Sequence, residues 1–335
     1  MREFEINTNE AGQRFDKYLK KLLGQAPGSF VYKMLRKKNI VLNGKKADGT
    51  EKLREKDRVT LFLSDETFEK FSTGSQPSPE YESLKRLAGR FTSGELELQV
   101  VYEDADVIII NKPSGMLSQK AKPSDVSANE YILAWLMAAG KLTPEELPTF
   151  KPSVCNRLDR NTSGLLAAGK TLKGLQELSK ALKERSVQKY YRCIVKGEVL
   201  ESARIDGWLV KDRRTNQVAV LRETNGEDEA RRIETEYRPV QVLNGYTELE
   251  VHLITGRSHQ IRAQLAVLGH PIVGDVKYGD ADVNALFRKK AGVTSQLLHA
   301  YRMVFSDGTE VTAPCGEDFA RAEAFLSKAA LDKGR

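Results

Sequence analysis

The segment 156–166, Asn-Arg-Leu-Asp-Arg-Asn-Thr-Ser-Gly-Leu-Leu, places one carboxylate, Asp159, between Arg157 and Arg160 and directly before an apolar stretch. A polar loop at the mouth of a buried strand is a common position for catalytic residues. An aspartate is ionised at neutral pH, so it can serve as a nucleophile, a base or a stabiliser of positive charge. Taken alone, the triplet Arg157–Leu158–Asp159 also fits a surface turn with local ion pairs. Other segments of the chain are needed to distinguish an active-site loop from such a turn.

Four further segments accompany this loop. They are Tyr102–Pro113 and Lys189–Tyr191, each predicted to include a strand, Thr255–Arg262 at a strand-to-helix junction, and Gly269–Asp275. In this order, the Arg-Leu-Asp…Thr-Ser-Gly-Leu and Gly-Arg-Ser-His-Gln-Ile-Arg motifs resemble the RluA family of pseudouridine synthases, which modify large-subunit ribosomal RNA and transfer RNA. The resemblance covers nearly the whole chain.

The resemblance implies an isomerase that detaches a uracil from its ribose, rotates it and rejoins it through C5. Asp159 matches the essential aspartate of the family, acting on the ribose as nucleophile, base or charge stabiliser. Arg262 matches the arginine that pairs with it, and such a neighbour favours the ionised carboxylate. Tyr191 matches the active-site tyrosine, whose ring can stack on uracil and whose hydroxyl lies where the C5 proton leaves. The alternatives are an ordinary exposed arginine and a core tyrosine.

Arg157 corresponds to the family arginine that enters the RNA helix in place of the flipped base, because a stacked uridine cannot react. Anchoring of a phosphate is the alternative function for this residue. Lys189 and His259 are weaker candidates for contacts with the RNA backbone. The family often has histidine before the Arg-Leu-Asp triplet, whereas this chain has Asn156, which can still hydrogen-bond to the loop.

The first 63 residues carry a net charge of +7, which equals that of the whole chain. Apolar residues at helical spacing predict two helices here, and the second is expected to be capped by Ser29 and to run through Lys38. Its exposed face carries Arg36, Lys37 and Lys38, which are either simply solvated or in contact with phosphates. Together with the turn at 41–45, this stretch resembles the αL RNA-binding module of a small-subunit ribosomal protein, and it points to the RluC/RluD-like branch of the family.

The rest of the chain changes character twice. Residues 64–94 include the polar, turn-rich stretch Ser72–Pro79 and are predicted to form a linker. From residue 95, many short strands mixed with a few helices predict an α+β domain with a mixed, largely antiparallel sheet. Within it, Ser258 is predicted to cap a helix. The expected organisation is an αL module at 1–63, a linker at 64–94 and a catalytic domain at 95–325.

Composition restricts the ligands. The chain has three cysteines without a CxxC pair and four histidines without ligand spacing, so we expect no metal site. The N-terminus has no apolar run suited to a signal peptide, and the aliphatic run 107–110 is too short to cross a bilayer.

We therefore expect a cytoplasmic enzyme that uses no cofactor and acts on RNA, with ribosomal RNA preferred over transfer RNA. The oligomeric state stays open, and a monomer is assumed. Two alternatives are an RNA-binding factor without catalysis and a nucleoside hydrolase or glycosidase, which usually needs a second acid or a metal.

Overall fold

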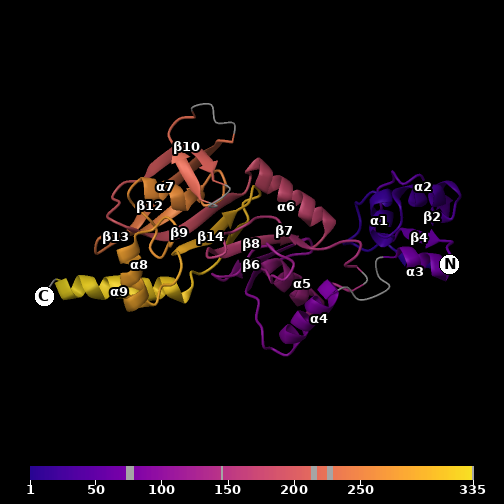
Figure 1. Cartoon of the computed structure of the whole chain (residues 1–335), viewed down its shortest axis with the longest axis horizontal. Coiled ribbons are helices and arrows are strands. Elements are labelled where there is room, and N and C mark those ends of the chain that lie inside the picture. The colour runs from indigo at the N-terminus through magenta and orange to yellow at the C-terminus, as the bar shows by residue number, and fades with distance from the viewer. Residues whose placement is uncertain (73–78, 145, 213–216, 225–228, 334–335) are drawn as a thin grey trace. The chain divides into compact units, whose positions relative to one another are not determined.

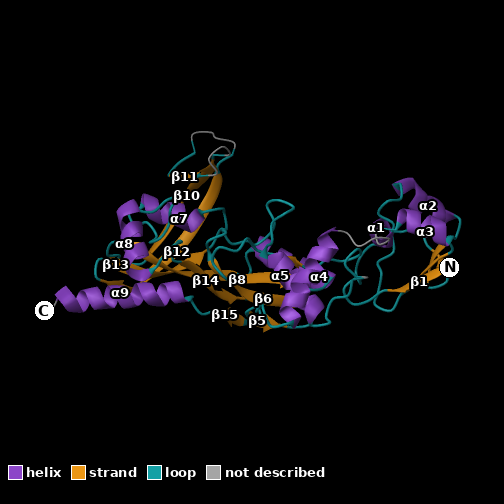
Figure 2. Ribbon diagram, turned by 60° about the horizontal axis from the view of Figure 1, so that its bottom comes forward, coloured by secondary structure: helices purple, strands orange, loops and turns teal. Residues whose placement is uncertain are grey.

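The computed structural model describes residues 1–72, 79–144, 146–212, 217–224 and 229–333 (Figures 1 and 2). The chain divides into two units. Unit 1 contains residues 1–108, 122–156 and 167–180, and unit 2 contains residues 109–121, 157–166 and 181–335. Strands β6 (Val107–Lys112) and β8 (Ser163–Gly169) each have one part in either unit. Helices and strands follow one another in mixed order, which confirms the α+β class.

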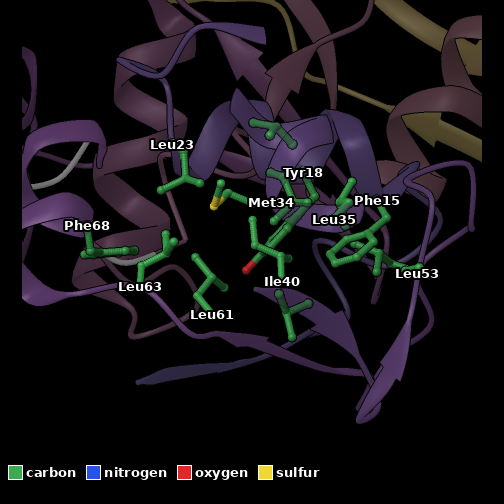
Figure 3. Packing of buried hydrophobic residues seen from close by; sticks show 14 of the residues in the cluster. Phe15, Tyr18, Leu23, Met34, Leu35, Ile40, Leu53, Leu61, Leu63 and Phe68 are labelled. Carbon is green, nitrogen blue, oxygen red and sulfur yellow. The ribbon is translucent and has the colours of Figure 1, made fainter. Parts of the chain in front are cut away.

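The N-terminal part of unit 1 is a small sheet covered by helices. Its elements are β1 (Arg2–Glu5), α1 (Phe15–Leu22), α2 (Gly28–Arg36), β2 (Ile40–Leu42), β3 (Lys45–Lys46) and β4 (Arg58–Leu61), and the strands lie in the antiparallel order β1-β4-β2-β3. Figure 3 shows Phe15, Tyr18, Leu35 and Leu61 within its core, and all four are almost completely buried. This core holds α2 in place, so the basic end of the helix has a fixed support.

One local prediction for this part needs correction. Helix α2 follows Pro27 and is not capped by Ser29, and it ends at Arg36 because Lys38 adopts φ +58°, outside the helical range. The expected linker contains α3 (Asp65–Phe71) and α4 (Pro79–Thr92), and Phe68 of α3 is buried in the N-terminal core. Residues 73–78 lie outside the described residues, and the domain limits at 63 and 94 stay predictions.

The remainder of unit 1 consists of β5 (Val100–Glu103), the start of β6, α5 (Ala128–Ala138), β7 (Ser153–Val154), the end of β8 and most of α6 (Leu172–Glu184). The Glu130 carboxylate accepts the backbone N–H of Ser127 at 3.1 Å, which fixes the start of α5. Phe91 of α4 meets Tyr131 of α5 edge to face, with ring centroids 5.7 Å apart. These contacts make α4 and α5 a packed pair.

Unit 2 is built on a mixed sheet (Figure 2). Its elements are β9 (Gln188–Lys196), β10 (Ala203–Lys211), β11 (Val218–Leu221), β12 (Arg231–Leu243), β13 (Tyr246–Leu253), α7 (Gln260–Val267), α8 (Ala281–Ala291), β14 (Leu298–Val304), β15 (Glu310–Thr312) and α9 (Glu317–Lys333). The order β11-β10-β12-β13-β9-β14 is antiparallel throughout, while β8 joins β14 in parallel. This confirms the predicted largely antiparallel sheet.

Helices of unit 2 cover the sheet and carry functional residues. Phe287 of α8 and Phe319 of α9 are buried with Ile194 of β9 in one apolar core. Helix α7 does not begin at a Ser258 cap, because His259 occupies the N-cap position with φ +56°. This left-handed conformation is uncommon for a residue other than glycine, and it determines where the His259 ring points.

Gly164 is a position that only glycine fits. Its φ is +111°, and a Cβ atom there would lie 2.2 Å from the carbonyl oxygen of Ala300 on β14. The residue therefore allows the close parallel approach of β8 and β14 directly after the Asp159 loop.

We predict that Gly164→Ala lowers the free energy of unfolding by about 3 kcal/mol or more, since the added methyl group meets backbone. Gly115→Ala is the matched control, because Gly115 also has positive φ (+84°) but open space around it. That variant should lose only about 1–2 kcal/mol from the left-handed backbone. Urea denaturation measures both, and equal losses would contradict the steric argument.

Candidate active site

The loop that carries Asp159 is held by its backbone. The Ser118 hydroxyl donates to the carbonyl of Leu158 at 2.9 Å and accepts the N–H of the same residue at 3.0 Å. The N–H of Thr162 donates to the carbonyl of Asp159 at 3.0 Å and closes the turn. With its backbone anchored on both sides, Asp159 presents its side chain, 26% exposed, from a fixed position.

Lys112 anchors the same loop from within the protein. It is completely buried, and its Nζ donates to the carbonyl oxygens of Pro113 (2.9 Å), Met116 (2.8 Å) and Arg160 (3.2 Å). Three acceptors match the three N–H bonds of an ammonium group. Burial lowers the pKa of Lys112 to about 7, although the negative charge of Asp159 acts in the opposite direction.

Arg262 of α7 lies between two carboxylates. Its Nη1 donates to Oδ2 of Asp159 at 2.8 Å, while its Nε and Nη2 donate to the two oxygens of Asp275 at 2.7 and 2.9 Å. The side chain of Asp275 is 0% exposed and that of Arg262 is 7% exposed. The bidentate pair with Asp275 therefore orients the guanidinium, so that one N–H of Nη1 is directed at Asp159.

The charges in this trio are strongly coupled. Burial opposes the charge of Arg262, but the hydrogen bonds and negative charges of Asp275 and Asp159 outweigh it, so the pKa of Arg262 is raised. Burial also opposes the charge of Asp275, but the pKa of Asp275 is lowered because it accepts from Arg262 and from the N–H groups of Lys277 and Tyr278. The trio is consequently one cation with two anions.

Tyr191 lies in the middle of β9, with its side chain buried. It is 6% exposed and pairs in register with Val251 of β13 and Ala300 of β14. Burial, followed by the negative charge of Asp159, raises the pKa of the Tyr191 hydroxyl, so the phenol stays protonated near neutral pH. Tyr190 points to the other side, where it stacks on His252 at 4.6 Å.

Comparison with known proteins shows the family to which the chain belongs. Residues 106–267 match the family model described as RNA pseudouridylate synthase. Ribosomal large subunit pseudouridine synthase C of Vibrio vulnificus (strain CMCP6) is 31% identical to this chain, over 93% of the chain and 92% of the relative. The protein of the same name from Vibrio cholerae serotype O1 is 32% identical over 90% and 87%, respectively. The chain belongs to the RNA pseudouridine synthase family.

Solved structures support the same fold. Human RNA Pseudouridylate Synthase Domain Containing 4 aligns with a TM-score of 0.56 at 20% identity, over 73% of this chain and 97% of the human chain. Human RNA Pseudouridylate Synthase Domain Containing 1 aligns with a TM-score of 0.51 at 21% identity, over 65% and 83%. The chain is thus an RNA pseudouridine synthase, an isomerase that acts on RNA, as its motifs predict.

The predicted RNA-contacting residues of the synthase lie in different places. Arg157 is exposed on the loop beside Asp159. Lys189 lies on β9 two residues before Tyr191 and therefore on the same side of the sheet. Its Nζ is close to Gly256, 3.3 Å from the position that a Cβ atom would take there. Burial, followed by the charge of Arg185, lowers the pKa of Lys189. Their contacts with RNA stay predictions.

The basic residues of the N-terminal module are exposed as expected. Arg36, Lys37 and Lys38 all lie on the surface at the end of α2 in unit 1. Asn156, which replaces the usual histidine, accepts the N–H of Ala167 at 2.8 Å through its side-chain oxygen. It therefore still hydrogen-bonds to the strand that follows the loop.

Three residues of the site were not singled out from the sequence: Lys112, Asp275 and Tyr278. Lys112 and Asp275 lie in the segments Tyr102–Pro113 and Gly269–Asp275, which contribute to the family resemblance. That position was the only sign in the sequence that they could belong to the site. Tyr278 contacts His259, with the Nδ1 atom and the hydroxyl oxygen 2.9 Å apart, and its ring lies 5.2 Å from the Arg262 guanidinium carbon. Their functions depend on contacts between distant segments, which spacing alone does not reveal.

Across the described ranges, no cluster of three or more histidine, cysteine, aspartate or glutamate side chains is arranged to hold a metal ion. None of the helices in the described part of the chain combines the length and apolar character needed to cross a membrane.

We predict that Asp275→Asn lowers the free energy of unfolding at pH 7 by about 3–5 kcal/mol, because it leaves a buried guanidinium without its bidentate partner. The lowered pKa of Asp275 means that its stabilisation is present above the ordinary carboxyl pKa and is lost as pH falls through the folded-state value. The difference between wild type and variant should therefore shrink below about pH 4. Urea denaturation at pH 7 and pH 3 measures it, and a constant difference would contradict the ion-pair argument.

Proposed function

We propose that this synthase isomerises uridines in large-subunit ribosomal RNA and that Asp159 is the residue that acts on the ribose. The relatives from both Vibrio species are named ribosomal large subunit pseudouridine synthases. The observation that carries the catalytic assignment is the hydrogen bond from the buried Arg262 to Oδ2 of Asp159. It holds the carboxylate, whose side chain is 26% exposed, in one orientation.

The two oxygens of Asp159 differ in their surroundings. Oδ2 accepts from Arg262, whereas Oδ1 accepts no hydrogen bond from the residues that the structure describes. We assign Oδ1 to the contact with the ribose of the target nucleotide. A carboxylate oxygen there can attack C1′, take a proton from the sugar or stabilise positive charge at the ring. All three steps require the ionised form that Arg262 favours.

Tyr191 is proposed as the residue that meets the uracil. Its phenol is buried and protonated, on a rigid strand in the middle of the sheet. A ring held in this way offers a flat surface for base stacking, and its hydroxyl offers a proton donor or acceptor for the exchange at C5. The raised pKa supports a neutral phenol during binding.

Arg157 is proposed to take the place of the flipped base. It is exposed on the same loop as Asp159, while Leu158 between them is buried. An exposed guanidinium beside the acting carboxylate can stack in the helix or bind phosphate once the target uridine has left the stack. Lys189 would add a contact with the RNA backbone.

The N-terminal module is proposed to supply affinity that does not depend on sequence. Arg36, Lys37 and Lys38 form a basic patch at the end of α2, called the α2 patch below. Neutralising phosphates releases counterions, so this part of the affinity should fall steeply with salt. Because ribosomal RNA is the proposed substrate, we also propose that the enzyme acts in the cytoplasm. We propose that it acts as a monomer, because a single chain contains Asp159, Arg262 and Tyr191.

We predict that Asp159→Asn abolishes turnover while RNA affinity stays within a few fold, because the isosteric amide removes the charge but little surface. Tritium release from RNA labelled at uracil C5 measures turnover, and filter binding measures affinity. Asp206→Asn is the control, because Asp206 is an exposed aspartate on β10. Normal tritium release by the Asp159 variant would overturn the catalytic assignment.

The α2 patch gives a second prediction. Replacing Arg36, Lys37 and Lys38 by alanine should reduce the slope of log K against log salt by about 2–3, as expected for three lost phosphate contacts. The matched control replaces Arg288, Lys289 and Lys290, an exposed Arg-Lys-Lys run at the end of α8, by alanine. Equal slopes for the two variants would contradict the function assigned to the patch.

A further inference from the structure

The hydroxyl of Tyr278 lies between two polar groups. It is 2.9 Å from the backbone nitrogen of Val218 and 2.9 Å from Nδ1 of His259. A backbone N–H can only donate, so the Tyr278 oxygen accepts from Val218. The hydroxyl keeps one proton and a second lone pair, so it can pair with His259 in either direction, and we assign the hydroxyl as the donor and Nδ1 of His259 as the acceptor.

This hydrogen-bond order determines the tautomer of His259. A neutral imidazole that accepts at Nδ1 carries its proton on Nε2. Burial lowers the pKa of His259 and favours the neutral form. The charged groups that face the ring act both ways: Asp159 and Asp275 favour the protonated form, while Arg262 and Lys277 oppose it.

The Nε2 atom of His259, which carries the proton in this tautomer, faces the carboxylate of Asp159. Nε2 of His259 lies 3.9 Å from Oδ2 of Asp159, the same oxygen that accepts from Arg262. We propose that His259 is a positioning residue: it is neutral, directs an Nε2–H bond at Oδ2, and so leaves Oδ1 to meet the ribose. This inference rests on the function proposed for Asp159 and adds a second donor to its orientation.

A neutral donor has a physical advantage over a second cation here. Another full positive charge next to Arg262 would stabilise the ionised Asp159 further and make its oxygen a weaker nucleophile or base. An N–H dipole restrains the rotation of the carboxylate without that penalty. At 3.9 Å the contact is longer than a hydrogen bond, and such catalytic contacts commonly shorten when substrate binds.

The backbone around His259 is consistent with a dedicated ring position. The residue has φ +56°, a left-handed conformation that most residues with a side chain avoid. Such a conformation persists only where surrounding contacts stabilise it. Gln260 supplies such support, because its side chain accepts the N–H of Arg257 at 3.1 Å and donates to the Glu234 carbonyl at 3.0 Å. Tyr278 is fixed in turn, since its N–H donates to Asp275 at 3.1 Å.

Two substitutions of His259 separate the proposed function from a purely structural one. The amide nitrogen of glutamine reaches the position of Nε2, whereas that of asparagine reaches the position of Nδ1. We expect His259→Gln to keep kcat within about tenfold and His259→Asn to lose about 100-fold, with KM little changed in both. If His259 only served the left-handed backbone, asparagine would be the better replacement, because it tolerates that conformation. That opposite order would overturn the inference.

Nitrogen NMR tests the tautomer without any reference to activity. The chain has four histidines, so ¹⁵N-histidine labelling gives a simple spectrum, and loss of one signal set in His259→Gln assigns the residue. We expect a protonated Nε2 and an unprotonated Nδ1 at pH 7.5, with a mixture of tautomers in Tyr278→Phe. A protonated Nδ1, or an imidazolium, would overturn the inference.

The two proposals can fail separately. An active Asp159→Asn enzyme would refute the catalytic assignment of Asp159, whatever the tautomer of His259. An inactive Asp159→Asn enzyme together with a protonated Nδ1 would refute the positioning function of His259 alone.

Discussion

The ion trio of Asp159, Arg262 and Asp275 is the interaction on which the rest of this site depends. Asp275 is fully buried and uses both oxygens to hold Arg262, so it neutralises the cation away from water. The net charge of the trio is then −1, and the exposed end of that charge is Asp159. Burying the first pair thus directs a single reactive carboxylate toward solvent, where a nucleotide can reach it.

The backbone keeps this carboxylate in place independently of the ion trio. Lys112 and Ser118 bind main-chain atoms on either side of Asp159, and Gly164 lets β8 approach β14 directly after the loop. A side chain carried by such a loop loses little conformational entropy when the substrate binds. Arg262 therefore only has to select one orientation of the carboxylate.

Local sequence patterns predicted many of the helices and strands. Contacts between residues far apart in the sequence could not be predicted from such patterns. Alternation along β9 puts the buried Tyr191 and its neighbour Tyr190, which stacks on His252, on opposite sides of the strand, because strand geometry fixes successive side chains in this way. The start of α7 was predicted wrongly, since the contacts of Gln260 with Glu234, 26 positions away, favour a left-handed His259 over a Ser258 cap. Such contacts form only in the folded chain.

The functions of the buried charged residues were hidden for the same reason. Asp275 looked like part of a motif, and only its pairing with Arg262 13 positions earlier shows what it does. Lys112 similarly reads as the end of a strand, although its ammonium group binds the Asp159 loop through the carbonyl of Arg160. From residue type alone, both would be predicted to lie on the surface, because lysine and aspartate are rarely buried without partners.

The position of Asp275 also argues against the hydrolytic alternative considered from the sequence. Glycosidases generally use two carboxyl groups, one of which exchanges a proton with the leaving group or with water. Asp275 shares Arg262 with Asp159, but it is 0% exposed, and its oxygens accept from Arg262 and from the N–H groups of Lys277 and Tyr278. A carboxylate with these bonds and a lowered pKa cannot serve as a general acid or reach a water molecule. The trio therefore presents one solvent-accessible carboxylate, that of Asp159, which we propose meets the sugar, and a single carboxylate suits a reaction that keeps the uracil in the site and returns it to the same carbon.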